Sequence, residues 1–229
     1  MRKATVALSL MTLALLAAAG CSGQRNLMSV RENADYFAGQ GDYERSLSEY
    51  REYLQRLPED YEVRYRFANT LLANGDTGEA REQYAQLVDI VPNDDRFIDG
   101  YARALEQGGE TQDLARFLNR MTTQRGDARD WIRLGKSMQK NGDVDGAKAA
   151  FASAARADGG RTIAPWVAQA DLFASVGDAR GERAAIERAL FIEPQNPDLV
   201  SRFRGLGGIP GPTAGVRPEE WVDPTPKKK

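Results

Sequence analysis

The chain has 229 residues, which is enough for one packed domain or one array of repeats. Its formal net charge at pH 7 is −2, so it lacks the strongly basic surface by which proteins bind nucleic acid. It contains no histidine and a single cysteine, which excludes histidine general bases, the usual nucleophile–histidine pairs and nearly all zinc sites. The composition therefore predicts a protein that is not an enzyme, holds no metal and needs no cofactor.

The first twenty residues have the pattern of a secretory signal peptide. Arg2 and Lys3 precede an uncharged, mostly apolar run that ends in small residues at Ala18, Ala19 and Gly20. A transmembrane helix needs about 20 apolar residues, and the run between Lys3 and Gly20 is shorter and contains serine and threonine. We therefore expect residues 1–20 to be cleaved.

The only cysteine, Cys21, follows that segment directly, and the junction resembles the lipobox of bacterial lipoproteins. The resemblance implies cleavage before Cys21, a diacylglycerol on its thiol and an acyl chain, such as palmitate, on the new amine. Ser22, in place of aspartate, implies sorting to the outer membrane, on its periplasmic face. Residues 21–28 then form the lipidated cysteine and a short tether. The alternative is a cleaved protein that is released without a lipid.

A spacing of about 34 residues runs through the middle of the chain. Glycines followed by aspartate or glutamate recur at Gly41, Gly75, Gly109, Gly142 and Gly177. Seven residues before each of them stands a small residue: Ala34, Ala68, Ala102, Gly135 and Ala170. Nine residues after each stands a large one: Tyr50, Tyr84, Leu118, Phe151 and Ile186. A glycine suits the end of one helix, and an acidic residue suits the start of the next.

These positions resemble the tetratricopeptide repeat, a 34-residue pair of antiparallel helices. The resemblance implies an all-α fold: a superhelix of about five helix-turn-helix repeats over residues 29–195, followed by a capping helix. The small residues then lie where the paired helices touch, and the large ones fill the groove between them. Trp131 and Trp166 occupy the tryptophan position of the motif and are expected in the core.

The end of the chain divides into two parts. Asn196 and Pro197 can start a helix, so residues 196–206 are expected to cap the last repeat. Residues 207–229 are rich in glycine and proline and end in three lysines, which predicts a disordered tail. The alternatives for this tail are a partner-binding peptide and a strap that docks Trp221 on the repeats.

In tetratricopeptide repeats the first helix of each pair lines a concave groove that binds segments of other proteins. The resemblance places these residues in the groove: Tyr65, Asn69, Leu72, Arg103, Gln107, Arg129, Arg133 and Lys136. The basic members of this set would suit an acidic segment or a C-terminal carboxylate.

The sequence therefore predicts a membrane-anchored scaffold for protein–protein interactions, similar to the outer-membrane lipoproteins that act as pilotins or serve tight-adherence pilus systems. We expect it to assist assembly of an envelope machine: a pilus, a secretion system or the outer-membrane protein assembly machinery. The alternative is an adaptor that recruits peptidoglycan hydrolases or synthases. The sequence does not separate these two, because they differ in the partner and not in the mechanism.

Overall fold

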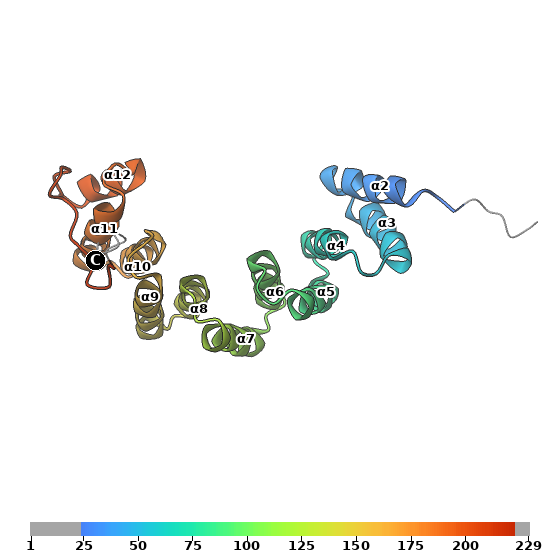
Figure 1. The fold of residues 1–229 in the computed structure, drawn as a ribbon, viewed down its shortest axis with the longest axis horizontal. Coiled ribbons are helices and arrows are strands. Elements are labelled where there is room, and N and C mark those ends of the chain that lie inside the picture. The colour runs from blue at the N-terminus through green and yellow to red at the C-terminus, as the bar shows by residue number, and fades with distance from the viewer. Residues whose placement is uncertain (1–23, 223–229) are drawn as a thin grey trace, which may run out of the picture. The chain divides into compact units, whose positions relative to one another are not determined.

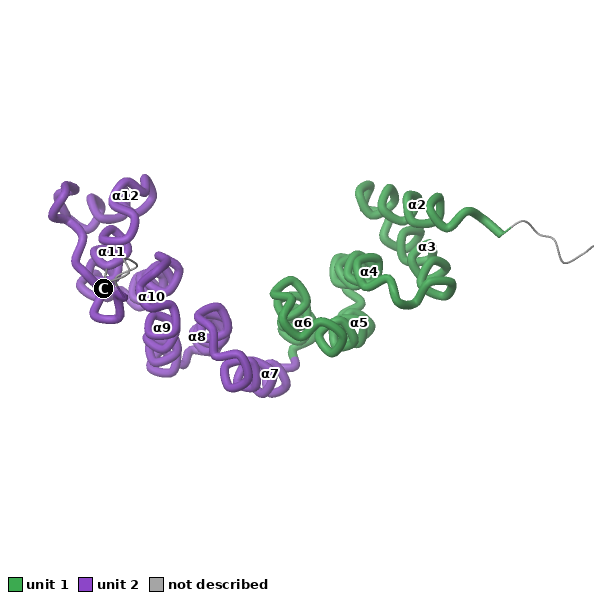
Figure 2. Tube along the Cα trace, viewed as in Figure 1, with its two compact units in different colours: residues 1–109 green, residues 110–229 purple. Residues whose placement is uncertain are grey.

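The computed structural model describes residues 24–222, and within that range it contains eleven helices and no strand (Figure 1). The described residues form two compact units, which meet in sequence between Gly109 and Glu110 (Figure 2). The predicted signal peptide, Cys21 and the last seven residues lie outside the described range. None of the described helices is long and apolar enough to cross a membrane.

The first unit holds five helices between residues 24 and 109, the part of it that the structure describes. They are α2 (Leu27–Gly39), α3 (Tyr43–Arg56), α4 (Tyr61–Asn74), α5 (Thr77–Ile90) and α6 (Asp95–Gln107). Helices α2 and α3 form one hairpin, α4 and α5 form the next, and α6 packs on α5. Each hairpin spans one predicted repeat.

The described part of the second unit, residues 110–222, holds six helices. They are α7 (Thr111–Gln124), α8 (Ala128–Lys140), α9 (Val144–Asp158), α10 (Ala164–Ser175), α11 (Ala179–Ile192) and α12 (Pro197–Gly205). From α8 onward, each of them packs against the helix that precedes it. The all-helical fold of paired helices with a final capping helix is therefore confirmed.

The turns between paired helices follow from the residues that recur in them. Each turn glycine has a positive φ, such as +75° at Gly41 and +80° at Gly142, a conformation that glycine adopts without steric cost. The aspartate that follows, as at Asp42, Asp143 and Asp178, caps the next helix by accepting a hydrogen bond from a main-chain N–H three residues on. The predicted starts and stops of the helices thus have a direct chemical basis.

Nine of the ten predicted packing positions are buried, and the tenth, Ala102, is only partly buried. Ala34, Ala68 and Ala170 are fully buried, and all five residues nine positions after the turn glycines are buried as well. At Gly135 a Cβ atom would lie 2.4 Å from the ring of Phe151, so only glycine lets helices α8 and α9 approach this closely. The small and the large position of one repeat therefore face each other.

Helix α12 closes the last repeat as predicted. Asn196 caps it by accepting hydrogen bonds from the N–H groups of Asp198 and Leu199. Leu199 and Phe203 are buried in the core cluster formed by α10 and α11. Because these two side chains cover the apolar face of the final hairpin, the array ends without an open core.

The chain after α12 differs from the disordered tail that its composition predicts. Residues 208–222, which we call the strap, run back along α11 to the turn between α9 and α10. The N–H of Val216 donates to the carbonyl of Glu187 (2.9 Å), and that of Val222 donates to the carbonyl of Gly159 (3.0 Å). The described part of the tail therefore follows the alternative prediction of a docked strap.

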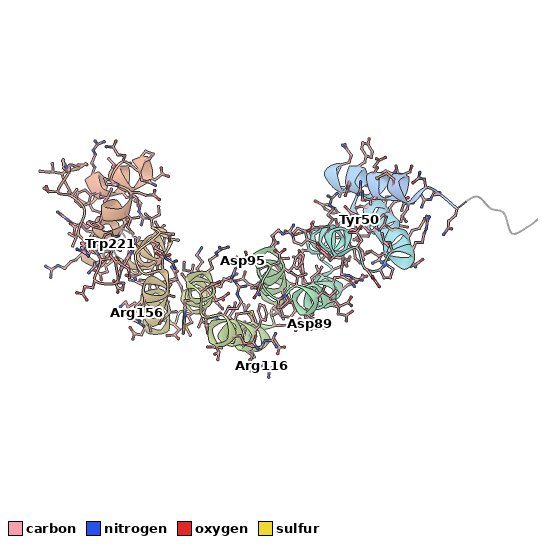
Figure 3. The ribbon with its side chains drawn as sticks, in the orientation of Figure 1. Tyr50, Asp89, Asp95, Arg116, Arg156 and Trp221 are labelled. Carbon is pink, nitrogen blue, oxygen red and sulfur yellow. The ribbon has the colours of Figure 1, made fainter. Side chains whose placement is uncertain are left out.

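Trp221 anchors the strap (Figure 3). Its ring packs edge-on against Phe191, with the ring centroids 5.7 Å apart, and the guanidinium of Arg217 lies 4.4 Å above it. Glycines allow the close approach: a Cβ at Gly160 would lie 2.8 Å from the Trp221 Cα, and one at Gly215 would lie 2.6 Å from the Phe191 main chain. A segment rich in glycine and proline cannot form a hydrophobic core of its own, but it can pack against the helices of a folded repeat.

Candidate functional site

In the first unit, polar side chains of the first helices are tied to tyrosines of the second helices. The hydroxyl of Tyr50, which is labelled in Figure 3, donates to the carboxylate of Asp35 (2.6 Å). The same carboxylate accepts from Arg66 (2.6 Å). One repeat later, the hydroxyl of Tyr84 donates to the Oδ1 atom of Asn69 (2.8 Å). In both repeats, therefore, the tyrosine nine residues after the turn glycine holds the polar residue six positions before that glycine.

Burial keeps these tyrosines as donors. Desolvation raises the pKa of both Tyr50 and Tyr84 well above the ordinary value for a phenol. The hydroxyls therefore stay protonated to a higher pH than an exposed tyrosine would, and each bond orients a polar group that is only partly exposed.

Asn69, which the sequence places in the groove, forms most of its hydrogen bonds with other residues of the protein. Its Oδ1 accepts from Tyr84 and, at 3.3 Å, from Arg103, and its Nδ2 donates to the carbonyl of Tyr65 (2.9 Å). An amide oxygen has two lone pairs, so little acceptor capacity is left for a partner. Asn69 thus links Tyr84 of α5 to Arg103 of α6.

Tyr65 belongs to an aromatic cluster on the same face. Its ring lies 5.5 Å from that of Phe97 and 6.2 Å from that of Tyr84, and the guanidinium of Arg96 stands 5.3 Å above it. Leu72 is half-buried, whereas Arg103 and Gln107 are exposed on α6. The first unit thus presents Arg103 and Gln107 to solvent above a partly buried polar and aromatic layer.

In the second unit, the three predicted basic residues of α8 divide into two kinds. Arg129 and Lys136 are exposed. The side chain of Arg133 is only 12 % exposed and forms an ion pair of 2.8 Å with Asp130, whose own side chain is fully buried. Arg125 lies 3.2 Å from the other oxygen of the same carboxylate.

Asp130 is a residue that the sequence analysis missed. Burial is the main cause that raises the pKa of its carboxyl, and the neighbouring Asp127 adds to it, while Arg125 and Arg133 act in the opposite direction. The only signal in the sequence was the spacing of Asp130 and Arg133, which puts them on one side of a helix. Arg133 therefore compensates a buried charge, and of the three predicted residues on α8 the exposed ones are Arg129 and Lys136.

A family comparison agrees with this architecture. Residues 37–104 match the model of the tetratricopeptide repeat. A search of curated proteins finds no relative that matches the chain.

Solved structures of repeat proteins resemble this chain over most of its length. A thermophilic tetratricopeptide-repeat protein of Thermus thermophilus has 21% sequence identity and a TM-score of 0.52, and the match covers 79% of this chain and 98% of that one. A repeat protein of Parabacteroides merdae has 13% identity and a TM-score of 0.53, with 90% and 80% covered. MamA from Desulfovibrio magneticus has 16% identity and a TM-score of 0.53, with 75% and 97% covered. At these identities the likeness concerns the fold.

Proposed function

We propose that this chain, whose described helices have the tetratricopeptide-repeat fold, is a membrane-anchored scaffold that binds a segment of a partner protein in the cell envelope. Exposed cations on the first helices of the repeats carry the proposal: Arg103 in the first unit, and Arg129 and Lys136 in the second. These side chains suit an acidic segment or a C-terminal carboxylate. The proposal assigns no catalytic step to the protein.

The anchor is part of the same proposal and rests on the sequence around Cys21. A lipidated Cys21 would hold the first described helix, which begins at Leu27, near the membrane. Extended chain spans at most about 3.6 Å per residue, so the six residues from Cys21 to Asn26 reach only about 20 Å. A scaffold held this close is suited to assembling a pilus, a secretion system or outer-membrane proteins.

Charge reversal on α8 tests the binding surface. We expect Arg129→Glu combined with Lys136→Glu to abolish capture of crosslinked partners in intact cells, because it replaces two exposed cations with two anions. Arg133 stays in place, since a glutamate there would lie beside the buried Asp130 carboxylate. The melting temperature should change by no more than a few degrees.

A matched control reverses two exposed cations elsewhere in the second unit, Arg156→Glu and Arg180→Glu. Both residues lie on second helices of repeats, α9 and α11. This control should retain its partners. If the α8 variant captures the same partners at the wild-type level, the first helix of this repeat is not the binding surface.

The anchor is tested by Cys21→Ser. We expect this variant to move from the membrane fraction to the soluble fraction and to keep its helical circular dichroism spectrum, because Cys21 is the residue on which the resemblance places the lipid. A variant that remains in the membrane fraction after a carbonate wash would contradict the proposed lipid anchor.

A further inference from the structure

The strap closes one end of a cavity in the second unit. The cavity has a volume of about 300 Å³, which is at the lower end of the range for ligand pockets. Its walls come from α10 and α11, with a contribution from α9, and the strap adds Glu219 and Glu220. No residue of α8 lines it, so it is not the binding surface proposed above.

The helical wall of the cavity offers aromatic surface and hydrogen-bond donors. Trp166 and Phe173 supply two rings, and the guanidinium of Arg188 lies 5.6 Å from the centre of the Trp166 ring. Arg188 donates to the carbonyl of Ala184 (3.0 Å) and forms no ion pair with any residue in the described range. Its remaining N–H groups can serve an acceptor in the cavity.

Trp166 adds a second donor. The residue is 3 % exposed, and its indole N–H is buried without a hydrogen-bond partner among the described residues. A buried donor without a partner costs about 1–3 kcal/mol, so native proteins seldom leave one unsatisfied. Water or a ligand carbonyl that reaches this group would remove the cost.

The wall formed by the strap has the opposite character. Within residues 24–222, neither the Glu219 nor the Glu220 carboxylate takes part in an ion pair or a side-chain hydrogen bond, although both line the cavity. Two carboxylates in one wall of a cavity attract a cation. The cavity thus combines carboxylates on one side, donors for a carbonyl on another and the partly exposed ring of Phe173, which can cover an aliphatic stem.

We propose that this cavity binds a lysine side chain presented by an extended peptide. The ammonium would pair with Glu219 and Glu220, the methylene groups would lie against Phe173, and a peptide carbonyl would accept from Arg188 or the Trp166 indole. The repeats alone do not form this site, because both carboxylates belong to the strap. The inference goes beyond the proposed function, since it concerns a different surface and the opposite ligand charge.

Nuclear magnetic resonance tests this site directly. The protein would be titrated with acetyl-Gly-Lys-Gly-amide while the indole N–H resonance of Trp166 is followed, after assignment through Trp131→Phe and Trp221→Phe. We expect a saturable shift of this resonance. The matched peptide with glutamine in place of lysine should bind about fivefold more weakly, because it lacks the charge for a partly exposed ion pair.

Variants identify the carboxylates. Glu219→Gln with Glu220→Gln should lower the affinity for the lysine peptide about fivefold and leave the rest of the spectrum in place. The matched control, Asp145→Asn with Glu193→Gln, neutralises two exposed acids of the same unit that do not line the cavity, and it should bind as the wild type does.

Three results would overturn the inference: equal affinity for the lysine and glutamine peptides, tighter binding of a glutamate peptide, or unchanged affinity in the double variant. Each can occur while the α8 surface still captures its partners, so failure here is distinct from failure of the proposed function.

Discussion

The first two repeats and the last two place different chemistry at the same positions. Nine residues after the turn glycine, the first unit has Tyr50 and Tyr84, and the second has Phe151 and Ile186; all four are buried. The tyrosine hydroxyls bond to Asp35 and Asn69, which stand six residues before the turn glycine. An apolar residue at the same place has no such bond to offer.

That difference changes which first-helix side chains are available to a partner. The residues of the second unit equivalent to Asp35 and Asn69 are Lys136, which is exposed, and Asp171, which pairs with Arg202 of α12 (2.7 Å). The same position of the repeat therefore has three different environments. In the first unit its side chain is hydrogen-bonded to a tyrosine, in α8 it is an exposed lysine, and in α10 it forms an ion pair with the capping helix α12. The buried apolar residues hold the two helices of each hairpin together. The residue six positions before the turn glycine determines which polar group that hairpin exposes to solvent.

The largest loss of stability is expected when the buried residue nine positions after a turn glycine is truncated. Phe151→Ala removes a fully buried ring that lies against Gly135, and it should lower the free energy of unfolding by about 3–5 kcal/mol. Urea denaturation followed by circular dichroism measures this loss. A cost below about 1 kcal/mol would show that Phe151 is not a core residue and that the assigned register of this repeat is wrong.

A smaller cost is expected when the tyrosine of the first unit is placed in the second. Phe151→Tyr adds a buried hydroxyl, and the side chain at the position of Asp35 and Asn69 is Lys136, which has no acceptor. An unsatisfied buried hydroxyl should cost about 1–3 kcal/mol. The double variant Phe151→Tyr with Lys136→Asn restores an acceptor and should recover part of the loss; if it recovers none, the tyrosine–amide pairing is not transferable between the units.

The reverse exchange in the first unit should cost least at neutral pH. Tyr84→Phe deletes one hydrogen bond to Asn69, whose Oδ1 still accepts from Arg103, so we expect a loss of about 1 kcal/mol. Binding to partners should also weaken if Asn69 holds Arg103 in position. An unchanged free energy of unfolding would mean that water replaces the phenol without cost.

The same variant gives a pH test. The pKa of Tyr84 is raised in the folded protein, so the folded state holds this proton more tightly than the unfolded state does. This contribution is complete below the ordinary tyrosine pKa of about 10 and is lost as the pH rises toward the folded value. Above a pH of about 10 the wild type should therefore lose stability more steeply than Tyr84→Phe, and parallel curves would contradict the buried hydroxyl.

Periodicity in the sequence predicted much of this protein because helix contacts repeat with the residues that make them. The spacing of the turn glycines located the hairpins, and the aspartates after Gly41, Gly142 and Gly177 became helix caps. Such features depend on a few neighbouring residues, so a local pattern is enough to reveal them. The start of the capping helix at Pro197 was predictable for the same reason.

The tertiary structure determined which polar side chains are paired within the protein and which are exposed. Arg133 and Lys136 looked equivalent in sequence, but Arg133 lies over the buried carboxylate of Asp130, and Asn69 is occupied by Tyr84 and Arg103. The docking of Trp221 on Phe191 joins residues far apart in the chain and depends on glycines that permit contact between main chains. By itself the sequence determined the repeat and its core, because burial follows helical periodicity. The tertiary structure alone decided which charged side chains remain exposed, because an ion pair or a buried hydrogen bond requires both partners to be in place.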